Sequence, residues 1–162
     1  MFNSLRSWQI LLLWLPAACS QESVESGPAA AEEPRAEAAA PTVLARTPSA
    51  EGARVFFITP SDGDTVSSPA QFEFGVSGMD LAPSGTDRPN SGHHHIIVDH
   101  DLPDLSLPVP KDAQRIHFGD GRSETELDLG PGQHTLQLLF ADHLHIPHDP
   151  PLISERISIT VE

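Results

Sequence analysis

The sequence predicts an all-β fold, an immunoglobulin-like antiparallel β-sandwich, for residues 53–162. Two observations lead to this prediction. Short apolar or alternating segments follow one another with turns rich in Gly, Pro, Asp and Ser between them, and none shows sustained helical periodicity. About seven such segments in about 110 residues match the strand number and size of a sandwich with one core.

The first expected strands lie between clear turn sequences. Arg54–Thr59 (RVFFIT) is mostly apolar and precedes the turn sequence PSDGD. Gln71–Ser77 (QFEFGVS) alternates apolar with polar residues, as a strand with one buried face does. His94–Asp99 is a short apolar run and is expected to form the next strand.

The remaining strands follow the same logic. Ile116–Phe118 is brief and ends at the sequence GDG, and Glu124–Leu129 places two leucines on one face. The turn sequence GPGQ leads into His134–Ala141, and Ile153–Val161 closes the chain as one expected strand. No internal repeat interrupts this order.

Residues 1–18 are expected to be a secretory signal peptide. Arg6 provides a positive charge, and the apolar run Ile10–Leu15 is too short to span a bilayer. Cys19 follows two alanines and is the only cysteine, so the segment resembles a bacterial lipoprotein signal in which Cys19 becomes the lipidated mature N-terminus. Pro16 stands where that signal usually has leucine, and the alternative is an ordinary signal cut after Ala18.

A secretory signal peptide predicts that the protein lies outside the cytoplasm. We expect the bacterial periplasm, with lipid anchoring to a membrane, the outer membrane being favoured. With one cysteine, no intrachain disulfide is possible. Residues 19–52 are rich in Ala, Glu and Pro and poor in large apolar residues, which predicts a flexible linker between the anchor and the folded domain.

The chain is strongly acidic. Nine basic residues against 23 acidic ones give a formal net charge of −14. Nucleic acid and anionic lipid surfaces both require clustered Lys and Arg, so neither is expected as a main partner. All nine histidines lie beyond residue 92. The electrostatic field of the domain is therefore expected to change with pH near the ordinary pKa of imidazole.

The histidine-rich sequences also carry a family resemblance. GHHHIIVD, followed by HFGDG, PGQHTLQL and DHLHIPHDPP, forms a long ordered combination over about residues 92–161. This combination resembles a bacterial exported domain of unknown function, family 4399, and the upstream ITPSDGDTVSSPAQFEFGVSGM is also similar. The family carries no established activity, so the resemblance implies one folded unit and leaves its chemistry open.

The histidines form two clusters. In an extended chain alternate residues share a face, so in GHHHIIVD the side chains of His93 and His95 project together and His94 projects the other way. The second cluster, DHLHIPHDPP, contains a further alternate pair, His143 and His145, ahead of a proline-rich loop. If the clusters meet at one end of the sandwich, they supply three or four imidazoles, enough for a divalent ion.

The sequence therefore predicts a site for a divalent transition metal. The expected ligands are His93, His95, His143, His145 and His148. The residues expected to support them are Asp142 and Asp149, as further ligands or by orienting an imidazole, and His94. The expected folded domain has no thiol and one methionine, Met79, so Zn(II) or Cu(II) is favoured over Cu(I). No nucleotide cofactor is expected.

Two other interpretations stay open. His100, His117 and His134 are expected to have structural roles at strand ends and turns. The whole domain can also be a metal-free module that binds another envelope protein through its long loops, with a structural histidine network. The sequence contains no G-x-S-x-G nucleophile motif and no H-E-x-x-H motif, so it favours a binding domain over an enzyme and predicts no catalytic residue.

Overall fold

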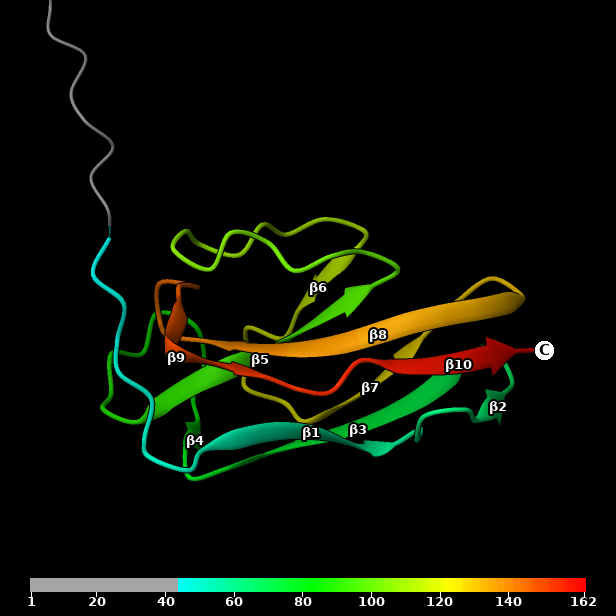
Figure 1. Ribbon diagram of the computed structural model, residues 1–162, viewed down its shortest axis with the longest axis horizontal. Helices are drawn as coiled ribbons and strands as arrows, with labels where there is room; N and C mark the ends of the chain where they lie inside the picture. Colours follow the sequence, from blue (N-terminus) through cyan, green and yellow to red (C-terminus); the bar gives the residue numbers. More distant parts are fainter. Residues whose placement is uncertain (1–43) are drawn as a thin grey trace, which may run out of the picture. The chain divides into compact units, whose positions relative to one another are not determined.

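The computed structural model describes residues 44–162, which form a two-layer β-sandwich (Figure 1). The all-β prediction is confirmed, since no helix occurs in the described part of the chain. The strands are β1 Arg54–Thr59, β2 Thr65–Val66, β3 Ala70–Ser77, β4 Asp80–Leu81, β5 Ser91–Val98, β6 Arg115–His117, β7 Glu124–Leu127, β8 Gly132–Ala141, β9 Pro147–Ile153 and β10 Ile157–Val161.

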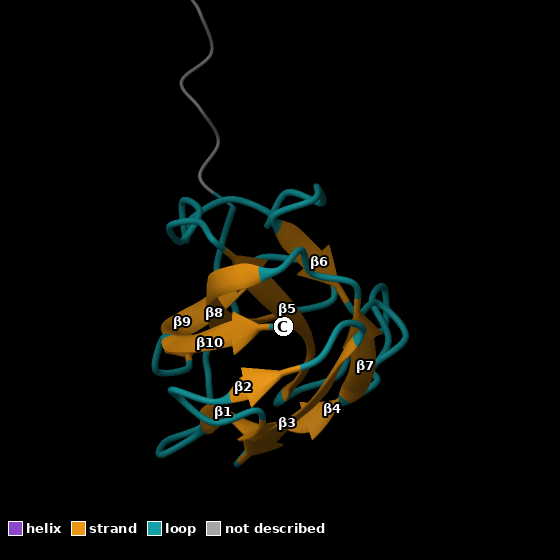
Figure 2. Ribbon diagram, turned by 90° about the vertical axis from the view of Figure 1, so that its right-hand side faces the viewer, coloured by secondary structure: helices purple, strands orange, loops and turns teal. Residues whose placement is uncertain are grey.

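The strands divide into a small sheet and a large sheet. The small sheet has the antiparallel order β1-β3-β7. The large sheet has the order β2-β10-β8-β5-β4, with β6 also paired to β5 and β9 also paired to β8. Two short pairings, β2 with β10 and β4 with β5, are parallel, so this sheet is mixed. Figure 2 shows the two layers end-on, with β1 and β3 in one and β8 to β10 in the other.

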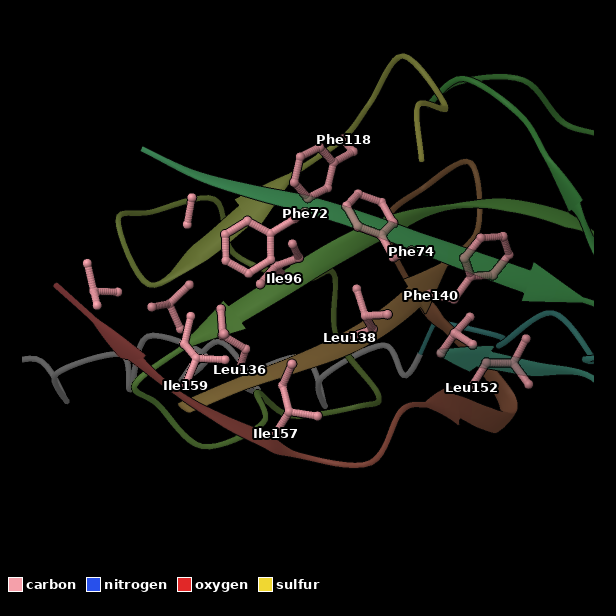
Figure 3. Close-up of a cluster of buried hydrophobic side chains, with 14 of the residues drawn as sticks. Phe72, Phe74, Ile96, Phe118, Leu136, Leu138, Phe140, Leu152, Ile157 and Ile159 are labelled. Carbon is pink, nitrogen blue, oxygen red and sulfur yellow. The ribbon is translucent and has the colours of Figure 1, made fainter. Parts of the chain in front are cut away.

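The main core lies between the two sheets. The alternating residues Phe72 and Phe74 of β3 face Leu136, Leu138 and Phe140 of β8 (Figure 3). All five side chains are buried. Burying each one stabilises the fold by about 1.5–3 kcal/mol, so the alternation in β3 and β8 favours packing of the two sheets face to face.

A second apolar layer covers the outer face of the large sheet. The segment 99–114, which joins β5 to β6, crosses that face (Figure 1). Val109 and Leu105 of this segment pack on Leu139 and Ala141 of β8. The Val109 N–H also donates to the carbonyl of His145 over 2.8 Å. As a result every residue of β5 is buried, on the core side and on the outer side.

The prediction of a single closing strand over Ile153–Val161 is wrong. The segment is split into the end of β9 and β10 because Ser154 leaves the regular ladder. The Ser154 N–H donates to the carbonyl of Leu138 over 3.0 Å, but the Leu138 N–H donates to the Ser154 hydroxyl over 2.8 Å instead of to a strand carbonyl. The proline-rich sequence expected to be a loop forms β9, which tolerates proline because it pairs with β8 alone among the named strands.

Several sequence-based expectations fall beyond the described part. The signal peptide, Cys19 and most of the expected linker lie outside residues 44–162. Within that range, no helix is long and apolar enough to cross a membrane.

Candidate metal centre

Strand β5 presents imidazoles on both faces of the large sheet. As its alternation predicts, His93 and His95 lie on one face, the outer one, with ring centroids 4.9 Å apart. Both side chains are buried, with 0% and 1% exposure. Neither ring has a hydrogen-bond partner for either nitrogen among the described residues.

His94 lies on the opposite face of β5, within the main core. Its ring centroid is 4.8 Å from that of Phe74 and 5.0 Å from that of Phe140, both in edge-on arrangements. Burial lowers its pKa to about 4, because the charged imidazolium would lose its hydration. The structure therefore separates His94 from the outer-face histidines that it was expected to support.

Strand β6 brings His117 beside this pair. His117 is directly opposite His95 in the β5–β6 register, and its ring centroid lies 5.1 Å from that of His95 and 4.9 Å from that of His93. Its ring rests over Gly119, where a Cβ atom would come within 2.2 Å of His117 Cε1. A residue without a side chain at position 119 is therefore required for this ring position.

The turn between β8 and β9 adds a fourth imidazole, that of His145. Its Nε2 lies 3.1 Å from Nε2 of His117, and its ring centroid lies 5.0 Å from that of His93. His145 has a left-handed backbone with φ of 66°, a conformation that few residues other than Gly and Asn adopt freely. We call His93, His95, His117 and His145 the histidine cluster.

Asp142 shapes the turn that carries His145. The Asp142 carboxylate is buried and accepts hydrogen bonds from the N–H groups of Leu144, over 2.9 Å, and Ile146, over 3.0 Å. The His145 N–H donates to the Asp142 carbonyl over 2.9 Å. Asp142 therefore supports the cluster by fixing the backbone of the turn, since its hydrogen-bond partners among residues 44–162 are backbone groups and the Thr47 hydroxyl.

The electrostatics keep the buried members of the cluster neutral. Burial, together with the nearby charges of His145 and His117, lowers the pKa of His93 to about 3. Burial and the neighbouring histidines lower the pKa of His95 to about 2. Burial and His145 also lower the pKa of His117. At neutral pH these rings therefore offer lone pairs, which is the protonation state that a metal ion requires.

The nitrogen positions suit a transition metal. One ring nitrogen from each of His93, His95 and His117 lies within 4.8 Å of the others, so these three side chains can hold a metal ion. Two imidazoles on tetrahedral zinc, at Zn–N of about 2.0–2.1 Å, have nitrogens about 3.3 Å apart. The 3.1 Å between His117 and His145 is close to that spacing. An all-imidazole set is compatible with Zn(II) or Cu(II).

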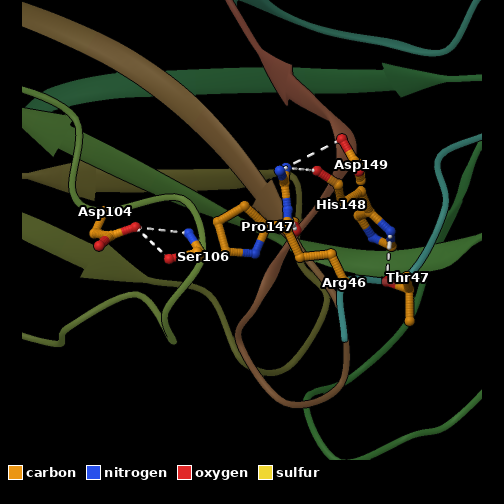
Figure 4. A network of polar contacts seen from close by, with 7 residues as sticks. All are labelled: Arg46, Thr47, Asp104, Ser106, Pro147, His148 and Asp149. Carbon is orange, nitrogen blue, oxygen red and sulfur yellow. Dashed lines mark hydrogen bonds and ion pairs between the residues drawn. The ribbon is translucent and has the colours of Figure 1, made fainter. Parts of the chain in front are cut away.

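The other two expected ligands lie elsewhere. His143 Nδ1 is 3.8 Å from an oxygen of Asp87. His148 is stacked on Phe140, and its Nδ1 lies 2.9 Å from the Thr47 hydroxyl (Figure 4). Both line a separate cavity of about 180 Å³. The structure does not bring His143 and His148 to the histidine cluster.

The environment of His148 fixes its tautomer. The Thr47 hydroxyl is 3.1 Å from Oδ2 of Asp142, and a carboxylate only accepts, so this hydroxyl donates to Asp142. His148 Nδ1–H therefore donates to Thr47. Asp149 is exposed, and its carboxylate forms an ion pair with Arg46 over 3.4 Å (Figure 4).

Of the three histidines expected to be structural, one belongs to the cluster. His134 does have a structural environment, with Asp99 and the Gly130 carbonyl each 2.7 Å from its ring nitrogens, and His100 is exposed. His117 differs, because pairing with β5 places it on the outer face. Its sequence HFG carries one weak signal, a glycine two residues after the histidine, which allows the ring to fold back over the chain.

The comparisons with known proteins agree with the resemblance seen in the sequence. No curated protein and no solved structure matches the chain. A family model, described as a domain of unknown function (DUF4399), matches residues 72–162. The matched range contains the whole histidine cluster together with β5 to β10. Because the match covers more than half of the sequence, the chain belongs to the family described as domain of unknown function DUF4399.

Proposed function

We propose that this protein binds a divalent transition metal, Zn(II) or Cu(II), at the histidine cluster, and that it serves in metal storage, delivery or structural support. The observation that carries the proposal is the burial of His93 and His95 with no partner for any of their four ring nitrogens among residues 44–162. His117 joins them from β6 with a ring nitrogen within 4.8 Å of theirs, and His145, from the turn between β8 and β9, has its Nε2 3.1 Å from that of His117.

The energetic argument concerns these unpartnered nitrogens. A buried polar atom without a partner costs about 1–3 kcal/mol, and native folds rarely leave several together. A metal ion would satisfy one nitrogen of each ring at once. It would also stabilise the native state, by an amount that grows with the logarithm of the metal concentration relative to its Kd, because the unfolded chain does not bring these histidines together.

We also propose that the protein is exported and held at a bacterial membrane, the outer membrane being favoured, through a lipid on Cys19. The support is the short apolar segment Ile10–Leu15 ahead of Ala17, Ala18 and the sole cysteine. Metabolic labelling with a fatty-acid analogue should mark the full chain and not a Cys19→Ser variant. Equal absence of label from both would leave an exported protein without an anchor.

One observation favours a second candidate function, a metal-free envelope protein-interaction module. The 3.1 Å contact of His117 with His145 can be a hydrogen bond between a protonated and an unprotonated Nε2. Together with the bond from Val109 to the His145 carbonyl, it would tie the segment 99–114 to the sandwich without any ion. That segment would then be a recognition loop on a rigid scaffold.

Metal titration separates the two candidates. The full chain in a Cys19→Ser background removes the only thiol as a competing ligand. We expect about one Zn(II) or Cu(II) per chain after dialysis, with a higher melting temperature. His117→Gln should lose both effects, whereas the matched His143→Gln, two residues from His145 but outside the cluster, should keep them. Stoichiometry well below one, with no thermal shift, would favour the interaction module.

A further inference from the structure

A shallow hollow lies beside the His117 edge of the cluster. Its volume is about 540 Å³. Its polar lining residues are Ser84, Lys111, His117, Asp120, Arg122 and Thr125. His117 is thus shared between the histidine cluster and this opening, which we call the Lys111 hollow.

Lys111 is unusual in this chain. It is the only lysine in the sequence, and its side chain is exposed. Most arginines of the described part form ion pairs with carboxylates: Arg46, Arg88, Arg115, Arg122 and Arg156. Lys111 forms none within residues 44–162, and Arg54 instead lies over the Phe56 ring. An acidic protein therefore presents an uncompensated ammonium group beside its candidate metal centre.

The other charges in the hollow cancel. The Arg122 guanidinium binds the Asp120 carboxylate over 2.6 Å and 2.8 Å, so this pair contributes little net charge. Lys111 and His117 line the same hollow, so the ammonium group lies beside this edge of the cluster. A divalent ion on the cluster would add two positive charges next to the same ammonium. The resulting field attracts anions, although the chain as a whole repels them.

Neutral hydrogen-bond donors complete the lining. The Ser84 hydroxyl is next to Gly119, since a Cβ atom on Gly119 would lie 3.0 Å from it. Thr125 adds a second hydroxyl to the lining. Hydroxyl and ammonium groups are the donors that carboxylates and oxyanions accept from. Ile116 and Phe118 line the rest of the hollow, so the donors are confined to one part of it. An anion of a few heavy atoms can contact that part alone.

We propose that the Lys111 hollow binds a small carboxylate or oxyanion beside the metal ion, held by Lys111 and the hydroxyls. This inference rests on the proposed metal function and deepens it, because it makes the site one for a metal together with an anionic ligand. The anion would be recruited after the metal, since the divalent charge supplies most of the attraction.

Calorimetry on the metal-loaded full chain, in the Cys19→Ser background, tests this inference with sodium acetate and sodium bicarbonate as probes. We expect Lys111→Ala to weaken the binding of at least one probe by tenfold or more, and to leave metal stoichiometry unchanged. Arg54→Ala is the matched control, because Arg54 is the other basic residue of the described part without an ion pair and it lies elsewhere, on β1. It should leave both bindings unchanged.

The possible failures are distinguishable. Metal binding with no measurable affinity for either probe, or with equal affinity in Lys111→Ala, would overturn the anion site and leave the proposed metal function intact. Failure of the parent protein to bind metal would overturn both. Because Lys111 is exposed, Lys111→Ala should fold, and Lys111→Gln provides a second neutral variant that should give the same loss.

Discussion

The buried histidines of β5 predict an unusually steep loss of stability in mild acid. His93, His94 and His95 have folded-state pKa values of about 3, 4 and 2, against 6.5 for an ordinary imidazole. Below pH 6.5 these three histidines bind protons in the unfolded chain but stay neutral in the folded chain. Stability is therefore present above pH 6.5 and lost as the pH falls toward the folded-state values.

The magnitude follows from linkage. Each group costs about 1.4 kcal/mol per pH unit once the pH is well below 6.5. Between pH 7 and pH 5 this gives about 2 kcal/mol for each histidine, and about 6 kcal/mol for the three together. Domains of this kind have total stabilities of about 5–15 kcal/mol. A loss of about 6 kcal/mol removes most of the stability of a domain in the lower part of that range, so the metal-free protein is expected to be much easier to unfold at pH 5 than at pH 7.

The assay is urea unfolding of chelator-treated protein at pH 7, 6 and 5. Circular dichroism is the suitable signal, because residues 44–162 contain no tryptophan. A free energy of unfolding that changes by less than about 1 kcal/mol over this range would refute the reasoning. That outcome would mean that the three imidazoles take up protons in the folded state.

Three substitutions give further predictions. His94→Leu removes one titrating ring from an apolar site, so it should reduce the acid slope by about a third, or about 1.4 kcal/mol per pH unit, and should not reduce stability at pH 7. Gly119→Ala places a Cβ against His117 and should weaken metal binding at least tenfold by calorimetry. Gly130→Ala is the control, because a Cβ at position 130 meets nothing within 4 Å, and it should bind metal normally. Equal metal affinities of the two variants would contradict the close approach of Gly119 to His117. Ser154→Ala removes the buried hydroxyl that accepts from the Leu138 N–H, and should lower the free energy of unfolding in urea by about 1–3 kcal/mol. An unchanged urea midpoint would show that the split between β9 and β10 does not depend on that hydroxyl.

The amino-acid sequence by itself determined the class of fold and much of the strand order. Alternation in β3 and the apolar run after the three histidines are local patterns, and the structure forms strands at both places. The same period of two predicted that His93 and His95 would share a face, because that relation depends only on an extended backbone. Family membership also rests on sequence alone.

The tertiary structure decided which histidines meet. His117 lies 22 residues beyond His95 in the chain and reaches it through the β5–β6 register, which depends on how the segment 99–114 packs. His143 and His145 would share a face in an extended chain, but the tight turn around Asp142 and the left-handed backbone of His145 direct their rings to different sites. Register and turn conformation arise from contacts between distant residues, so a local pattern cannot specify them.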